Sequence, residues 1–418
     1  MNRKLQMMIV GLVVAGFLGI RAVGQTAYVT NQSDSSVSVI NIVNDSVIAT
    51  IRVGILPTGV SANKAGSKVY ITNSGISSVN VINTFTNTVE ATIPLGVDAD
   101  GIAVSPDGTR VYVTNFGFST VTIINALTNT IINTVIVGGS PNGIAVSPDG
   151  SKVYVTNVAS NTVSVISEPG HYVMANIPVG DSPTGIAVSP NGSKVYVTNG
   201  GILLTGNTVS VINTASNSLS ATIAVGNSPY GIIVSPDGSK VYVTNTLDGT
   251  VSVIRTATDS ILTTIPGFGE PEGLSESNGR SRVYVANNGL NTVSVIDTAT
   301  NAIEATIIVG QNPIAFGNFI STATVGIPSL TPASPSISIY PNPANTILNI
   351  HSQLTIDNCQ LIITDVMGNE VYRETLPAII NCQLSIVNWN AGIYFYEIRG
   401  VGTGLQIPTN TRGKFIKE

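Results

Sequence analysis

A repeat of fixed length sets the limits on what this chain folds into. The segment SPDGSKVYVTN occurs at 147–157 and, letter for letter, again at 235–245. Close variants raise the number of copies to seven, and each copy ends in an Asn. These residues are Asn31, Asn73, Asn115, Asn157, Asn199, Asn245 and Asn287, so the step is 42 residues five times and 46 once. A period of this size is typical of repeat architectures, in which each unit packs against the next.

One repeat reads as four short strands. In 143–184, GIAVS (143–147) forms strand A, VYVTN (153–157) strand B and TVSVI (162–166) strand C, and strand D lies around 175–179. The β-branched and aromatic residues of B and C favour strands, and the SPDG turn between A and B carries typical turn residues. No stretch has the 3.6-residue period of a helix. The repeat therefore predicts an antiparallel four-stranded sheet.

The strands are apolar on both faces, so each sheet needs a neighbour on either side. Seven sheets arranged radially meet that need, which predicts an all-β fold with a seven-bladed β-propeller over 25–320. The repeats begin with a strand B at 27–31 and end on an A-like segment at 312–320. We therefore expect the last A to join the first B, C and D in a composite closing blade.

The repeated VYVTN, GIAVSPDG and TVSVI resemble the YVTN β-propeller family, which occurs in microbial surface proteins. The resemblance covers 27–320. It implies seven blades of four strands, in agreement with the count from spacing.

The recurrent Asn is expected to bond nearby backbone where strand B ends. The Tyr two or three residues before it is expected in the core between blades. These residues are Tyr28, Tyr70, Tyr112, Tyr154, Tyr196, Tyr242 and Tyr284.

The C-terminal part has a different composition. Residues 321–336 are rich in Ser, Thr and Pro and predict an extended linker. Short alternating strands in 337–418 predict a small β-sandwich. YPNPA, the DVMGNEV hairpin, GIYFYEI and the terminal GKFIK resemble the C-terminal sorting domain of type IX secretion substrates. The resemblance implies a Bacteroidota source, the type IX machinery as a partner, and a secreted or outer-surface location.

The N-terminal sequence and the net charge indicate where the protein is located and which partners are not expected. Arg3 and Lys4 precede an apolar run at 7–20, and small residues follow, which predicts a secretory signal peptide over 1–24. The alternative is an uncleaved anchor. After cleavage no transmembrane segment is expected. The net charge is −5 and no basic cluster occurs, so nucleic acid is not an expected partner.

The sequence contains few residues that could form a catalytic site. The chain has two His, and His171 is expected to be a loop substitution in a C–D loop. No Ser-His-Asp set or metal-binding His pair is evident, and no catalytic residue is assigned.

The candidate site follows from ring geometry. The residue before the Gly of strand A should line the mouth of the central channel, and this position varies between repeats. Asp100, Asn142, Tyr230 and Glu272 are the expected ligand-binding residues there. The other three positions are Thr58, Thr184 and Ile314.

Carboxylates at or near these channel-mouth positions suggest a calcium site. Asp98, Asp100, Glu270 and Glu272 would hold Ca²⁺ through oxygen ligands. Propeller lactonases are similar in placing a metal at such a mouth. The alternative is a variable, solvated loop rim. No other cofactor is expected.

We therefore predict a non-enzymatic binding protein, with an unknown extracellular glycan or protein as ligand. The alternatives are a lactonase-type hydrolase and a structural component of a surface coat. Both ends of the propeller should leave from the side of the SPDG turns, so the D–A and B–C loops are the expected binding face.

Two further expectations concern covalent chemistry. Cys359 and Cys382, the only cysteines, form either a disulfide or two buried thiols. The triplets DSV, DSI and DTA resemble the O-glycosylation motif of Bacteroidota, with Ser46, Ser260 and Thr298 as acceptors in C–D loops expected to be exposed.

Overall fold

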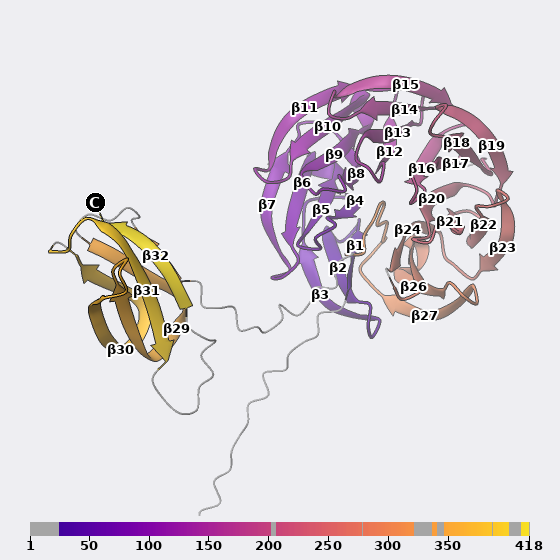
Figure 1. The fold of residues 1–418 in the computed structure, drawn as a ribbon. Coiled ribbons are helices and arrows are strands. Elements are labelled where there is room, and N and C mark those ends of the chain that lie inside the picture. Colours follow the sequence, from indigo (N-terminus) through magenta and orange to yellow (C-terminus); the bar gives the residue numbers. More distant parts are fainter. Residues whose placement is uncertain are drawn as a thin grey trace, which may run out of the picture. The chain divides into compact units, whose positions relative to one another are not determined.

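The computed structural model describes residues 25–201, 206–277, 279–321, 337–340, 347–386, 388–400 and 411–417 (Figure 1). The chain divides into two compact units, Met1–Val325 and Gly326–Glu418. The predicted signal peptide and positions 322–336 of the predicted linker lie outside the described residues. Among the residues described, no helix is long and apolar enough to cross a membrane.

The first unit is a ring of seven antiparallel sheets, or blades, as the repeat predicted (Figure 1). Blades 2 to 7 have four strands each, and blade 1 has three strands completed by the segment 312–321. Short 3₁₀ turns occupy three of the B–C loops: η1 (Ser74–Ile76), η2 (Phe116–Phe118) and η4 (Asn288–Leu290).

The strands follow the predicted order in every blade, and A is innermost. Strand A is β4 (Pro57–Ala62), β8 (Ala99–Val104), β12 (Pro141–Val146), β16 (Pro183–Val188), β20 (Pro229–Val234) and β24 (Pro271–Ser277). Strand B is β1 (Thr26–Asn31), β5 (Lys68–Asn73), β9 (Arg110–Asn115), β13 (Lys152–Asn157), β17 (Lys194–Asn199), β21 (Lys240–Asn245) and β25 (Arg282–Asn287). Strand C is β2 (Ser36–Asn41), β6 (Ser78–Asn83), β10 (Thr120–Asn125), β14 (Thr162–Ser167), β18 (Thr208–Asn213), β22 (Thr250–Arg255) and β26 (Thr292–Asp297). The outermost strand D is β3 (Ser46–Arg52), β7 (Thr88–Pro94), β11 (Thr130–Ile136), β15 (Tyr172–Pro178), β19 (Ser218–Ala224), β23 (Ser260–Pro266) and β27 (Ala302–Ile308).

The hydrophobic core lies between blades. Tyr112 and Val121 of blade 3, for example, pack with Ile144 and Val153 of blade 4 in one cluster. All seven strand-B tyrosines are at most 1% exposed, so their predicted place in the inter-blade core is confirmed. Burial between sheets explains how strands that are apolar on both faces are accommodated.

The recurrent Asn acts across strands. Nδ2 of Asn157 donates to the hydroxyls of Thr162 and Ser164 on strand C, at 3.0 and 2.9 Å. The same pair of bonds recurs in the other blades, with Asn80 taking the place of one hydroxyl in blade 2. We expected this Asn side chain to bond mainly to nearby backbone. That expectation is wrong, because the side-chain amide bonds two hydroxyls of strand C instead.

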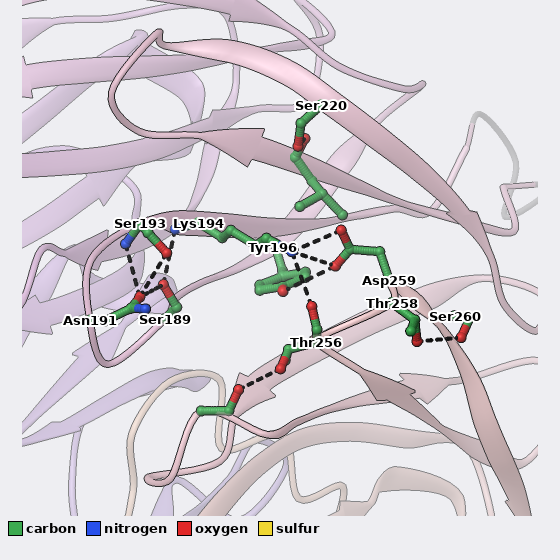
Figure 2. Close-up of polar contacts among 12 residues, drawn as sticks. Ser189, Asn191, Ser193, Lys194, Tyr196, Ser220, Thr256, Thr258, Asp259 and Ser260 are labelled. Atoms are coloured by element: carbon green, nitrogen blue, oxygen red, sulfur yellow. Dashed lines mark hydrogen bonds and ion pairs between the residues drawn. The ribbon is translucent and has the colours of Figure 1, made fainter.

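A polar clasp links neighbouring blades at their outer part (Figure 2). Lys194 of blade 5 donates to Asp259 Oδ2 of blade 6 at 2.8 Å, and Tyr196 donates to Asp259 Oδ1 at 3.3 Å. The clasp position in the C–D loop has a left-handed φ in every blade, which suits Asn and Asp. His171 occupies this position in blade 4 and contacts Glu168 of its own loop, and here it is Glu168 that pairs with Arg110 of blade 3.

The closing segment at 312–320 joins blade 1, as predicted, but it does not form a regular strand. Its two ends pair with β1 through bridges from Pro313 to Asn31 and from Ile320 to Ala27. Between them the chain leaves β1 and bulges inward: the Val60 amide of β4 donates to Phe316 O at 3.0 Å. Gly317, with φ of 124°, permits this path, because a Cβ there would overlap with Val60 O. The segment thus joins blade 1 and also narrows the channel.

The second unit is all-β, as predicted. Its strands form one antiparallel sheet: β28 (Ile337–Tyr340), β29 (Ile347–Thr364), β30 (Glu370–Ser385), β31 (Gly392–Gly400) and β32 (Thr411–Lys417).

The strand register of this sheet does not pair the two cysteines. It places Cys382 opposite Ile350 and Cys359 opposite Leu376. Leu376 and Cys382 are six residues apart on β30, or ~20 Å at the usual rise of a strand. A disulfide needs Cα atoms within ~7 Å, so this register favours two thiols, and the choice between the two alternatives stays a prediction.

Candidate functional site

The predicted ring residues sit in a β-bulge at the start of strand A. In blade 4 the pairing of β12 with β13 skips from Pro141 to Ile144, so Asn142 and Gly143 leave the ladder. The same irregularity occurs in blades 2 to 7. A bulge redirects side chains and frees backbone groups, and here it brings the variable residue to the inner end of the blade.

The Thr of YVTN bonds the freed backbone and joins neighbouring blades. Thr156 Oγ1 accepts from the Gly143 amide at 2.8 Å and donates to Thr184 O of blade 5 at 2.7 Å. The bond to the next blade recurs at Thr30, Thr72, Thr114, Thr198 and Thr244. Blade 7 has Ala286 instead, and there the Gly273 amide donates directly to Ile314 O at 2.9 Å.

The Gly of strand A is required by this close approach. A Cβ on Gly143 would overlap with Thr184 O of the next blade, and the equivalent glycines of the other blades meet the same obstacle. Sequence reasoning used the Thr and Gly only as repeat markers. Their recurrence in six of the seven repeats was the available signal, but it did not reveal that their partners lie in the next blade.

Three of the four predicted ligand residues form a half-buried polar cluster, and the fourth extends it. Nδ2 of Asn142 donates to Asp100 Oδ2, and Thr58 also bonds this carboxylate. Burial raises the pKa of Asp100 to about 6 despite these bonds. Glu272 lies near enough to Asp100 to interact electrostatically, and burial, with Glu270 and Asp100, raises its pKa to about 7.

Tyr230 closes the cluster on its other side. Its ring packs against Phe316 of the closing segment, with centroids 5.1 Å apart. Burial, together with Glu272 and Asp100, raises the pKa of the Tyr230 phenol well above its ordinary value. The ring residues therefore pack into and obstruct this end of the channel.

The four carboxylates expected to hold Ca²⁺ do not come together. Asp98 and Glu270 are exposed and face the B–C loops of their own blades, where Gly117 and Gly289 leave room for them. Within the part of the chain that the structure describes, no three His, Cys, Asp or Glu side chains are placed to hold a metal. The structure therefore gives no support to the predicted calcium site of Asp98, Asp100, Glu270 and Glu272, which stays a prediction.

The channel itself contains a cavity of about 550 Å³. It extends from the strand-A glycines and Phe316 to Pro148, Pro190 and Pro236 of the A–B turns, which are exposed. The cavity therefore opens among the A–B turns, on the opposite side of the ring from the Asp100 cluster. Small apolar side chains of strand A make up most of its wall, and Glu276 is the only charged residue among the described lining.

The two faces of the ring differ in charge. The D–A and B–C loops, here called the D–A face, contain Asp34, Asp98, Asp181, Asp248 and Glu270 but no Lys, Arg or His. One cation borders them: Arg52, at the end of β3, donates to Asp34 O at 3.5 Å. The A–B turns and C–D loops, here called the A–B face, are bordered by nearly all the cations. These are Lys64, Lys68, Arg110, Lys152, Lys194, Lys240, Arg255, Arg280 and Arg282.

Exposed apolar side chains add to the D–A face. Phe118 is 55% exposed and Leu247 58% exposed, and both lie in B–C loops. Ile76, Phe116 and Leu290 are exposed in the same loops. Ile55 in the adjoining D–A loop packs over Gly75, so apolar side chains from two loops lie together. Sequence reasoning named this face but not these residues.

The chain ends of the propeller are on the A–B face, as expected. Ser321, the last described residue of this unit, donates its amide to Thr26 O at 3.0 Å. Thr26 begins the first strand B. The D–A face is therefore free of both ends.

The comparisons with known proteins agree with the two-part organisation. The family model of a YNCE-like beta-propeller matches residues 186–316, and that of a secretion system C-terminal sorting domain matches 338–406. No curated protein matches the sequence. The sorting domain indicates export by type IX secretion to the cell surface or the extracellular space.

Two solved structures are similar in fold. A Kuenenia stuttgartiensis hydrazine synthase chain matches with a TM-score of 0.57 and 21% identity, over 61% of this chain and 87% of that one. A functionally unknown protein from Desulfotomaculum acetoxidans matches with a TM-score of 0.60 and 18% identity, over 70% of this chain and 99% of that one. At these identities the likeness shows the fold alone. The chain thus combines a YNCE-like β-propeller with a secretion system C-terminal sorting domain.

Proposed function

We propose that this protein is a non-enzymatic extracellular binding protein whose D–A face contacts a protein partner with a basic surface. The observation that carries the proposal is the composition of that face: exposed apolar side chains among carboxylates, with no cation in its loops. Aromatic and aliphatic anchors supply most of the binding energy in protein interfaces, and complementary charge orients the partner and speeds association.

The loops of this face are held in place, which favours binding. Asp248 accepts bonds from the Asn227 amide at 2.7 Å and from its side chain at 2.9 Å. Asp181 accepts from Asn161 in the same way, at 3.2 Å. Because loops that are ordered before binding lose less conformational entropy on association, a rigid face binds more tightly than a mobile one.

The lactonase-type alternative gains no supporting observation. Such an enzyme needs several metal ligands close together, and the ring carboxylates are paired with Asn142 and Thr58 or turned toward separate loops.

The proposal is tested by a binding screen of the purified full-length chain against basic extracellular proteins, acidic ones and glycans. We expect saturable binding to basic proteins, weakened by 0.5 M salt and at least tenfold by Phe118→Ser. Arg255→Ala, an exposed change on the A–B face, is the matched control and should bind as the unchanged chain. Hits confined to glycans or acidic proteins, or binding lost in Arg255→Ala but kept in Phe118→Ser, would contradict the proposal.

A further inference from the structure

Blade 7 departs from the repeat inside the channel. Strand β24 reads GLSES where β12 and β16 read GIAVS, so Ser275 and Glu276 replace an Ala and a Val. The register confirms the equivalence, because Glu276 pairs with Val283 as Val146 pairs with Val153. A carboxylate thus stands where blades 3 to 6 present Val104, Val146, Val188 and Val234 to the cavity.

One carboxylate oxygen of the half-buried Glu276 side chain has no partner. Its buried Oε2 makes no hydrogen bond, and the Tyr242 hydroxyl of blade 6, which has Thr298 beside it, lies near enough to interact with Glu276 electrostatically. Both residues line a niche of about 330 Å³ between blades 6 and 7, and Glu276 also lines the channel cavity. Leaving a buried carboxylate oxygen without a hydrogen bond is unfavourable, so a ligand that donates to Glu276 Oε2 gains binding energy.

The charged neighbours do not neutralise Glu276. Lys240 donates to Thr298 O at 2.5 Å and to Asn301 Oδ1 at 3.4 Å, so its ammonium is held at the C–D loop. Asp237 adds negative charge nearby, although its own side chain bonds Ser235 and Ser239. Burial and Asp237 raise the pKa of Glu276 to about 7, and Lys240 lowers it.

The rest of the channel-cavity wall determines which part of a ligand would fit beside a group bound to Glu276. Ala103, Ala145 and Ala187 alternate with the valines around the cavity, and Ser275 is already bonded to Asn318 at 2.9 Å. A volume of this size is typical of small-molecule sites, which are mostly apolar with a few placed polar groups. We propose that the channel cavity binds a small apolar molecule through a protonated primary amine, which donates hydrogen bonds to Glu276 and, in the niche that Glu276 also lines, to the Tyr242 hydroxyl oxygen.

The test is calorimetric titration of the purified full-length chain at pH 8 with primary alkylamines from propyl to octyl, and with 1-hexanol as the neutral match for hexylamine. We expect saturable binding of the amines, at least tenfold weaker binding in Glu276→Val and several-fold weaker binding in Tyr242→Phe. Hexanol should bind weakly and equally in all variants. Because Val is the residue of the other blades at this position, Glu276→Val should fold, which thermal unfolding checks.

The matched control is Glu90→Gln, which removes a carboxylate on the outer strand β7 that pairs with Lys68. This variant should bind the amines as the unchanged chain does. Equal amine binding by Glu276→Val and the unchanged chain, equal binding of hexylamine and hexanol, or no saturable binding of any amine overturns the proposal. The D–A face takes no part in this site, so the two proposals stand or fall separately.

Discussion

At the scale of single residues, the Thr of YVTN holds the ring together. One hydroxyl satisfies a bulged Gly amide of its own blade and reaches a carbonyl of the next. Six blades have this link, and the seventh, with Ala286, replaces it with a direct backbone bond. The Thr, which in the sequence marks only the end of strand B, is therefore a polar contact between the inner strands of neighbouring blades.

We predict that Thr156→Val lowers the free energy of unfolding by ~1–3 kcal/mol, because the Gly143 amide and Thr184 O both lose their partner while the volume of the side chain is kept. Urea unfolding measures the change. Thr264→Val, at an exposed site of β23, is the control and should have almost no effect. Equal loss of stability in the two variants would show that the inter-blade bond contributes nothing specific.

Buried carboxyls give the propeller an unusual dependence on pH. Burial raises the pKa of Asp100 to about 6 and the pKa values of Glu272 and Glu276 to about 7. Such groups bind their protons more tightly in the folded state, so their contribution to stability is present below the unfolded pKa and is lost as pH rises through 6 to 7. In the opposite sense, hydrogen bonds lower the pKa of Asp149 to about 2, which favours folding above pH 4.

We therefore predict that the unfolding temperature falls between pH 5 and pH 8, because the three carboxyls must ionise in a buried setting. Thermal unfolding across this range measures the slope, and the double variant Glu272→Gln, Glu276→Gln should reduce it. An unfolding temperature that rises from pH 5 to pH 8 is the contrary result.

At the scale of elements, the closing segment has two functions. It completes blade 1 through Pro313 and Ile320, and between these points it enters the channel and brings Phe316 against Tyr230. The sequence predicted the first function from the order of the strands. It did not predict the second, because NPIAFGNFI keeps the length of strand A, and only Ala315 and Gly317 with positive φ release the chain from β1.

Deleting 312–320 is predicted to destabilise the whole propeller by about 5 kcal/mol or more, since burying one Phe or Ile contributes ~1.5–3 kcal/mol and Phe316, Phe319 and Ile320 are all buried. β1 would also lose its inner partner and become an exposed edge. Thermal and urea unfolding of the shortened protein measure the loss. A shortened ring that unfolds like the full chain would show that blade 1 does not depend on this segment.

The C–D loops differ as sites of modification. Ser260 is exposed, as expected, whereas Ser46 and Thr298 are half-buried, so the expectation that all three acceptors are exposed is wrong. Asp45 and Asp259, which precede the two serines, are clasp residues paired with Arg282 and Lys194. We predict that, of the three, Ser260 carries the O-linked glycan. Peptide mass spectrometry of the native secreted protein checks this, and a glycan on Ser46 or Thr298 with none on Ser260 counts against it.

At the scale of the whole molecule, the repeat predicted most of the fold. A 42-residue period with strands apolar on both faces leaves a closed ring as the natural solution, and the tyrosines lie where that ring needs its core. The site was predicted less well, because a repeat specifies equivalent positions but not distances across a channel. Asp100 and Glu272 approach each other from different blades, whereas Asp98 and Glu270, two residues earlier, turn outward.

The same limit applies to the channel. The sequence shows which residues form the channel wall, namely the Ala and Val of GIAVS. It does not show that the channel opens on the A–B face, because that depends on Phe316 and Tyr230 obstructing the end at the D–A face. Both chain ends of the propeller unit lie on the A–B face, so the D–A face carries neither of them.

The most direct test of the central claim is hydrogen exchange of the full-length chain, alone and with the tightest basic protein found in the screen. Binding at the D–A face predicts slower exchange in its loops, at 53–56, 116–119 and 246–249, and unchanged exchange in the A–B turns at 147–151 and 235–239. Protection confined to those A–B turns, with the D–A and B–C loops unchanged, would contradict the account.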